Sequence, residues 1–151
     1  VNYTDAMAIE VGVDLQQTVD VVERAFAIAD EFRQQGIVHS APASIRFVKA
    51  SDAMIAMQQG RPTMMLEIII VKGVNNYMDL LRTYEQKLME EFGARPHWGL
   101  DVKVLQGESW PPQIYPRWED WKQIYRQFNS QGTFDGRFTD RLGISMRQAQ
   151  P

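Results

Sequence analysis

The sequence contains no cysteine, no long apolar run and no excess of basic residues. Without cysteine the chain forms neither disulfides nor thiolate metal sites, and we expect no metal centre. No stretch approaches the roughly 20 apolar residues of a membrane span, so we expect a soluble protein, with the cytoplasm favoured as its compartment. Lys and Arg number 16 against 19 Asp and Glu, a net charge of −3. This balance argues against a nucleic-acid partner, because a phosphate backbone requires a basic face.

A glycine-rich loop of the kind that binds nucleotide phosphates is missing as well. The chain of 151 residues is long enough for one domain with a modest core, but not for a dinucleotide-binding domain in addition. We therefore expect no strong dinucleotide site within this chain alone.

The first two thirds of the chain repeat a strand and helix pattern. Alternating or dense β-branched residues predict four strands, at residues 6–13, 43–50, 63–72 and 95–104. A first helix is predicted between Asp14, a candidate N-cap, and Gly36, and a second between Asn76 and Gly93. The positions expected to face the core are Val19, Val22, Phe26, Ala29 and Phe32 in the first helix and Tyr77, Leu81, Tyr84, Leu88 and Phe92 in the second.

The order β-α-β-β-α-β predicts an α+β, ferredoxin-like fold, with an antiparallel sheet in the order 4-1-3-2 and both helices on one face. We expect one domain over residues 1–151, made of a ferredoxin-like unit at 1–104 and a C-terminal helical extension at 105–151. Within the extension, aromatic residues at helical spacing predict a third helix, followed by an irregular tail. These residues are Trp118, Trp121, Tyr125 and Phe128.

The third strand is apolar at both parities between Met64 and Val71, apart from Glu67. A sheet with helices on one face and water on the other should alternate apolar and polar residues. The second face is therefore covered by another domain, by a dimer partner or by the chain's own tail. A buried Glu67 needs either a paired neighbour such as Arg46 or a functional pocket. Glu10 in the first strand raises the same question, although it could face solvent at a strand end.

Three segments resemble a known family of enzymes. The segment Gly-Ala-Arg-Pro-His-Trp-Gly-Leu, residues 93–100, resembles the His-Trp-x-Lys region of the sugar-lactone and alditol oxidases, which are flavoenzymes of the vanillyl-alcohol-oxidase superfamily. The segment Ser44-Ile45-Arg46 resembles their Glu-x-Arg strand, and residues 118–143 resemble their closing segment. The three segments occur in the family's order.

The resemblance implies the C-terminal substrate-binding (cap) domain of an FAD-dependent oxidoreductase, which oxidises a CH–OH carbon by hydride transfer to the flavin. It also implies that FAD is bound mainly by a domain absent from this chain, located elsewhere in the full-length protein or in a partner subunit. The chain alone is then expected to be inactive, and its other partner is a small-molecule alcohol. The resemblance does not separate an oxidase from a dehydrogenase, and a homodimer remains an option.

The resemblance also implies roles for individual residues. Arg46 matches the family's Arg and would hold an oxygen of the substrate or redox partner, while Glu67 and His97 complete the expected catalytic set. The expected substrate-binding set is Ser44, Ile69, Trp98 and Leu100.

Two of these positions depart from the family. Ser44 replaces its Glu and Leu100 replaces its Lys, so the sequence favours an alcohol that is less polar than a sugar lactone. Strict alternation would place His97 and Leu100 on opposite faces unless Gly99 permits a bend. His39 lies in a loop flanked by Ser and Pro, and we assign it to solvent.

Two alternatives remain open at this point. The first is a non-catalytic ferredoxin-like binding or dimerisation module, in which Arg46, Glu67 and His97 would lie far apart. The second is a small enzyme without a cofactor that uses Glu67 and His97 as acid and base.

Overall fold

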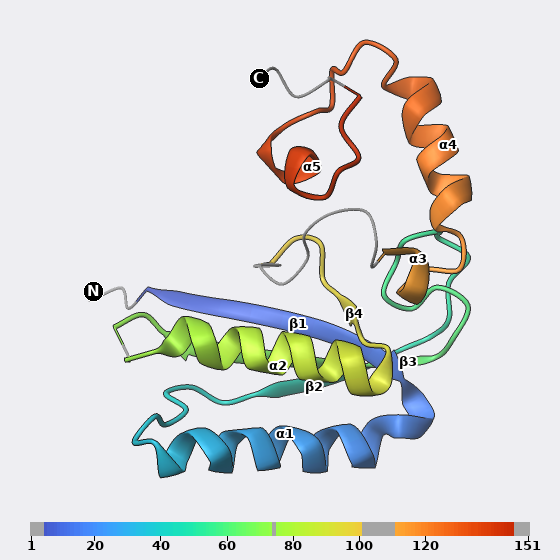
Figure 1. Cartoon of the computed structure of the whole chain (residues 1–151). Helices are drawn as coiled ribbons and strands as arrows, with labels where there is room; N and C mark the ends of the chain where they lie inside the picture. The colour runs from blue at the N-terminus through green and yellow to red at the C-terminus, as the bar shows by residue number, and fades with distance from the viewer. Residues whose placement is uncertain (1–4, 74, 101–110, 147–151) are drawn as a thin grey trace.

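The computed structural model describes residues 5–73, 75–100 and 111–146 (Figure 1). Its centre is one antiparallel sheet in the order β2-β3-β1-β4, which confirms the predicted ferredoxin-like topology. The strands are β1 (Ala6–Asp14), β2 (Ser44–Val48), β3 (Thr63–Val71) and β4 (Arg95–Pro96). The two long helices, α1 (Thr18–Gln34) and α2 (Tyr77–Phe92), run side by side on one face of this sheet (Figure 1).

Local capping sets the limits of both helices. Asp14 caps as predicted, because its side chain accepts a hydrogen bond from the Gln16 N–H at 2.9 Å. It opens a short 3₁₀ turn, Leu15–Gln17, before α1 begins at Thr18. At the other end of the pair, α2 stops at Gly93, whose φ of 58° lies in the left-handed region that glycine adopts without strain.

The main core lies between the sheet and the two helices. In α2 the predicted face is confirmed, since Leu81, Tyr84 and Leu88 are buried. In α1 the predicted face is wrong in part, because Val21 and Ile28 are the buried residues while Val19 and Phe26 are exposed. A different apolar stripe, with the spacing i, i+4, i+7 and i+11, faces the core instead. It is formed by Val21, Ala25, Ile28 and Phe32.

The loop after α1 also differs from expectation. His39 is half-buried and does not lie in solvent, because its Nε2 is 2.7 Å from the hydroxyl of Tyr84 in α2. That hydroxyl donates in turn to the carbonyl of Ala25 in α1 at 3.1 Å. Burial lowers the pKa of His39 and raises the pKa of Tyr84 to about 12.

Strand β4 is much shorter than predicted, covering Arg95–Pro96 only. Pro96 has no N–H to donate to a ladder. Beyond it the chain turns, and the Leu100 N–H donates to the His97 carbonyl at 3.1 Å. The remaining residues of the predicted strand, 101–104, lie outside the described part of the chain.

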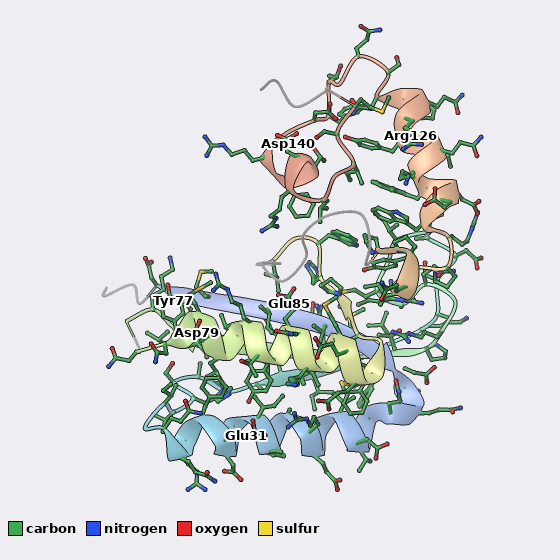
Figure 2. The ribbon with its side chains drawn as sticks, in the orientation of Figure 1. Glu31, Tyr77, Asp79, Glu85, Arg126 and Asp140 are labelled. Carbon is green, nitrogen blue, oxygen red and sulfur yellow. The ribbon has the colours of Figure 1, made fainter. Side chains whose placement is uncertain are left out.

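The C-terminal extension contains α3 (Pro111–Ile114), α4 (Trp118–Phe128) and α5 (Arg137–Arg141). Helix α4 confirms the predicted third helix, whereas the predicted irregular tail includes the short α5. The extension rises away from the sheet, with Arg126 and Asp140 far from α2 (Figure 2). Its base is fixed by a second core of Tyr115, Trp118, Leu142 and Ile144, against which Trp98 packs.

Buried Arg95 connects three separate segments. Its guanidinium donates to the carbonyl oxygens of Ile114 at 2.6 Å, Gln59 at 2.6 Å and Met57 at 3.2 Å. It also lies over the Tyr115 ring, 5.5 Å from the centroid. Burial lowers the pKa of Arg95 to about 10, so the cation is held by carbonyl dipoles at a desolvation cost. The loop before β3 is thereby drawn onto the sheet face opposite the helices.

Gly12 in β1 makes this close approach possible. A Cβ atom at this position would lie 2.8 Å from Thr63 Cγ2 and 2.9 Å from Met57 Cβ. Gly12→Ala should therefore destabilise the fold by about 1–3 kcal/mol through overpacking, measured by urea denaturation. Gly136→Ala is the matched control, because a Cβ there meets nothing within 4 Å. An equal, small effect of both substitutions would contradict the close approach of the loop.

Candidate functional site

Polar side chains gather on the sheet face opposite the helices. Glu67 in β3 pairs with Ser44 in β2 and with Glu10 in β1, so these three residues form one row across the sheet. Arg46 and Ile69 lie two residues along their strands and therefore point to the same face. The predicted common face of Ser44, Arg46, Glu67 and Ile69 is thus observed, whereas their chemical roles stay predictions.

The strongest interaction on this face is the pair between Glu10 and Arg46. The Arg46 Nε lies 2.8 Å from Glu10 Oε1, and its Nη2 lies 2.6 Å from Oε2. Only 2% of Glu10 is exposed, so the expectation that it could face solvent is wrong. The expectation that Arg46 pairs with Glu67 is also wrong, because the long side chain reaches past β3 to the central strand β1.

The geometry of this pair leaves part of Arg46 available. The hydrogen bond and charge of Glu10 raise the pKa of Arg46, so the guanidinium is permanently charged. Glu10 engages Nε and Nη2, and within the described ranges no partner is recorded for Nη1. The Arg46 side chain is 58% exposed. It can therefore donate to an oxygen of a bound molecule while Glu10 fixes its position.

Glu67 belongs to a separate pair. The Ser44 hydroxyl donates to its Oε2 at 2.8 Å, and the residue is half-buried. No partner is recorded for Oε1 in the described part of the chain. One carboxylate oxygen is therefore oriented by Ser44, and the other can accept a proton or a hydrogen bond.

His97 is placed beside Glu10 by the backbone. Its N–H donates to the Glu10 carbonyl at 2.8 Å, and its ring Nε2 lies 3.9 Å from Glu10 Oε2. The ring Nδ1 accepts from the Gly99 N–H at 3.0 Å. In the neutral ring the proton therefore resides on Nε2. Neutral His97 is a hydrogen-bond donor at this position and not a base.

A hollow of about 400 Å³ lies over this end of the face. Its lining includes Arg46, Met65, His97 and Trp98. The indole N–H of Trp98 is engaged by the Ile55 carbonyl at 2.9 Å, and its ring stacks on Tyr115 at a centroid distance of 5.6 Å. Trp98 thus offers a ring surface rather than a polar group.

Three of the four expected substrate-binding residues, Ser44, Ile69 and Leu100, do not line this hollow, and neither does the expected catalytic residue Glu67. Ile69 lies farther along β3, opposite Ala8. Leu100 is in the turn after His97, and the bend that the sequence allowed at Gly99 is present there. Their roles remain predictions.

Neither a metal-ion site nor a membrane-spanning helix occurs in the parts of the chain that the structure describes. Within residues 5–73, 75–100 and 111–146, no three His, Asp or Glu side chains gather as a metal-ion site would require. Among those same residues, no helix has the length and apolar character needed to cross a membrane.

Comparison with known protein families shows to which family the chain belongs. The sequence profile of the D-arabinono-1,4-lactone oxidase family matches residues 4–142. The chain belongs to this family. A search of curated proteins found no match. Membership in this family indicates an oxidoreductase domain of the lactone-oxidase type, and the oxidases of the family are generally flavoproteins.

The family match covers every residue of the candidate site. Glu10 is the one that sequence reasoning placed wrongly. The signal that could have found it is the same as for Glu67, namely a lone carboxylate within an apolar strand. Both lie in inner strands of the sheet, and Glu10 is the more deeply buried of the two.

The two carboxylates should respond differently to neutralisation. Glu10→Gln removes the buried negative charge that holds the Arg46 guanidinium in place. This substitution should therefore lower the urea midpoint of unfolding. Glu67→Gln should lower it less, because Glu67 is half-exposed and Gln still accepts from Ser44. Equal midpoints for the two variants would show that the Glu10 pair does not anchor this face.

Proposed function

We propose that this chain is the substrate-binding domain of an FAD-dependent oxidoreductase that oxidises the CH–OH carbon of a small alcohol. The observation that carries the proposal is the pair of donors at the hollow, Arg46 Nη1 and His97 Nε2–H, both beside Glu10. Two donors on one open face suit an oxygen on which negative charge develops. The full enzyme requires an FAD-binding domain, in the same polypeptide or in a partner subunit.

The hollow fits part of a flavin rather than a whole FAD. Met65 and Trp98 would supply apolar surface for the ring, while the donors Arg46 and His97 remain for the substrate oxygen. No glycine-rich phosphate cradle occurs in the sequence, so the diphosphate and adenosine would be bound by the other domain. When bound, the flavin supplies the acceptor for the hydride of the substrate.

The chain's own residues would manage the substrate oxygen and its proton. Arg46 donates to the oxygen and stabilises the charge that forms as the hydroxyl proton leaves. Glu67 receives that proton at Oε1, while Ser44 holds Oε2. His97 contributes a second donor and, with Nδ1 engaged by Gly99, does not compete for the proton.

The polar groups support a substrate with few hydroxyls. Glu10 accepts hydrogen bonds from Nε and Nη2 of Arg46, and the Ser44 hydroxyl donates to Glu67. These groups are therefore not available to a substrate. The donors that remain are Arg46 Nη1 and His97 Nε2–H, which lie next to the apolar Met65. We therefore favour an alcohol that is less polar than a sugar lactone.

A non-catalytic module is the less favoured alternative. That alternative expects Arg46 and His97 to lie far apart, yet both side chains approach the same Glu10 carboxylate.

The enzyme loaded with FAD and containing this chain offers a direct test. Under anaerobic conditions, cyclohexanol and D-arabinono-1,4-lactone are compared for their ability to bleach the flavin absorbance. We expect a larger specificity constant for cyclohexanol, and slower bleaching when its carbinol carbon carries deuterium.

The outcomes separate two parts of the proposal. A preference for the lactone would reject the less polar substrate and leave the oxidoreductase in place. If neither compound, nor a wider set of alcohols, reduced the flavin, the assignment as an alcohol oxidoreductase would be rejected.

A further inference from the structure

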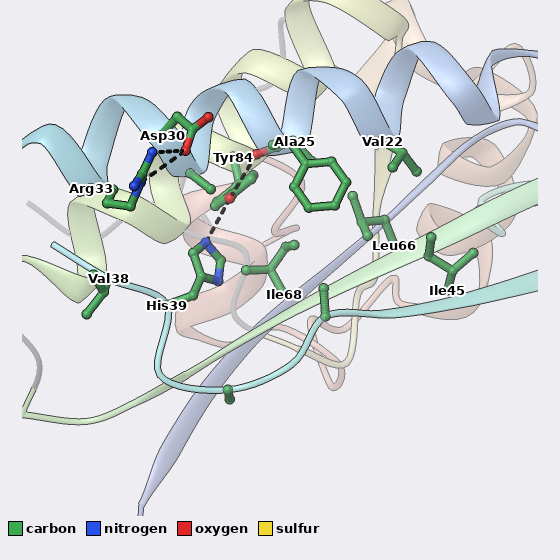
Figure 3. Close-up of a pocket in the computed structure, with 14 residues that line it drawn as sticks. Val22, Ala25, Asp30, Arg33, Val38, His39, Ile45, Leu66, Ile68 and Tyr84 are labelled. Carbon is green, nitrogen blue, oxygen red and sulfur yellow. Dashed lines mark hydrogen bonds and ion pairs between the residues drawn. The ribbon is translucent and has the colours of Figure 1, made fainter.

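A second hollow lies on the opposite side of the sheet, between α1 and β2 (Figure 3). Its volume is about 470 Å³, and its walls are formed by Phe26, Ala29, Ile45, Leu66 and Ile68. Ile45 and Leu66 are directly paired and alternate with the residues of the candidate site, so they point to the helix face. This hollow is therefore separated from the candidate site by the sheet itself.

The walls leave apolar surface in contact with water. Phe26 is 69% exposed and Ile45 is 44% exposed, and β2 is an edge strand with β3 as its only neighbour in the described sheet. Hollows of this size that are mainly apolar and carry few polar groups are typical of small-molecule sites. The polar groups therefore decide which chemistry the hollow would accept.

Among the polar residues that line the hollow, His39 has its tautomer fixed by hydrogen bonds. The Tyr84 hydroxyl donates its single proton to the Ala25 carbonyl, so it must accept from His39 Nε2. In the neutral ring, Nδ1 is then an acceptor. Figure 3 shows this second nitrogen on the side of Ile68, and no partner for it is recorded in the described ranges. The lowered pKa of His39, caused by burial, keeps the ring neutral at physiological pH.

The rim of the hollow carries no net charge. Asp30 and Arg33 of α1 both line it and pair with each other, with Arg33 Nη2 at 3.0 Å from Asp30 Oδ1 (Figure 3). A charged ligand would have to displace this internal partner, whereas an uncharged ligand would not.

We propose that this hollow is a second binding site, for an uncharged and largely apolar small molecule whose one hydroxyl group donates to His39 Nδ1. The site is independent of the proposed catalytic role, because its residues occupy the other face of the sheet.

Three matched probes of one ring system test the proposal by NMR titration of the whole chain at neutral pH. They are 2-naphthol, with a hydroxyl, naphthalene, without one, and 2-naphthoate, with a charge. We expect 2-naphthol to bind best and to shift the amide signals of α1 and β2 rather than those around His97.

Two variants locate the contact. His39→Phe keeps a ring but removes the acceptor, so it should weaken 2-naphthol about 3- to 10-fold, the effect of one hydrogen bond, and leave naphthalene unchanged. Ala29→Phe fills the hollow and should abolish binding of both probes. Ala27→Phe is its control, because Ala27 is exposed on the other side of α1 and does not line the hollow.

Three results would overturn the proposal. The proposal is overturned if no probe binds up to its solubility limit, or if 2-naphthoate binds most tightly, which would indicate an anion paired with Arg33. It is also overturned if His39→Phe leaves 2-naphthol binding unchanged. Should Ala29→Phe fail to fold, the comparison of His39→Phe across the two neutral probes still decides the matter.

Discussion

A carboxylate buried in the central strand is the constraint on which the candidate site depends. Glu10 is 2% exposed, and an unpaired charge at such a position would be strongly destabilising. Its partner Arg46 comes from β2, two strands away, and must therefore point to the face opposite the helices. Strand alternation then places Ser44 on the same face and directs Ile45 toward α1. The same register thus determines both hollows of the molecule.

The chain itself covers one end of the site face. Arg95 binds the carbonyl oxygens of Met57 and Gln59, and the absence of a side chain at Gly12 lets Met57 approach the sheet closely. The sequence favoured another domain, a dimer partner or the chain's own tail as this cover, but at this end the cover is instead the loop before β3. The half-exposed Glu67 and the exposed Arg46 remain at the open part of the face, where a second domain carrying FAD would dock under the proposed function.

Sequence periodicity was sufficient for the order of the strands and for α2, because Gly93 and one continuous apolar stripe determine that helix locally. It failed where tertiary contacts decide between local options. Two apolar stripes compete in α1, and only packing against the sheet selects the one with Ile28. The pairing of Arg46 with Glu10 rather than Glu67 depends on the reach of a side chain across a strand, which spacing along the chain does not encode. His39 was placed in solvent because its partner Tyr84 is 45 residues away.

The central claim is that Glu10 acts through Arg46, which it positions for the substrate oxygen. A double-mutant cycle of Glu10→Gln and Arg46→Met in the FAD-loaded enzyme, measured as kcat/KM for an alcohol that it oxidises, tests this most directly. Arg82→Met on α2 is the control for loss of an exposed arginine. We predict that each single change lowers kcat/KM and that Glu10→Gln has little further effect once Arg46 is gone. Losses that multiply independently, or a wild-type rate in Arg46→Met, would contradict the claim.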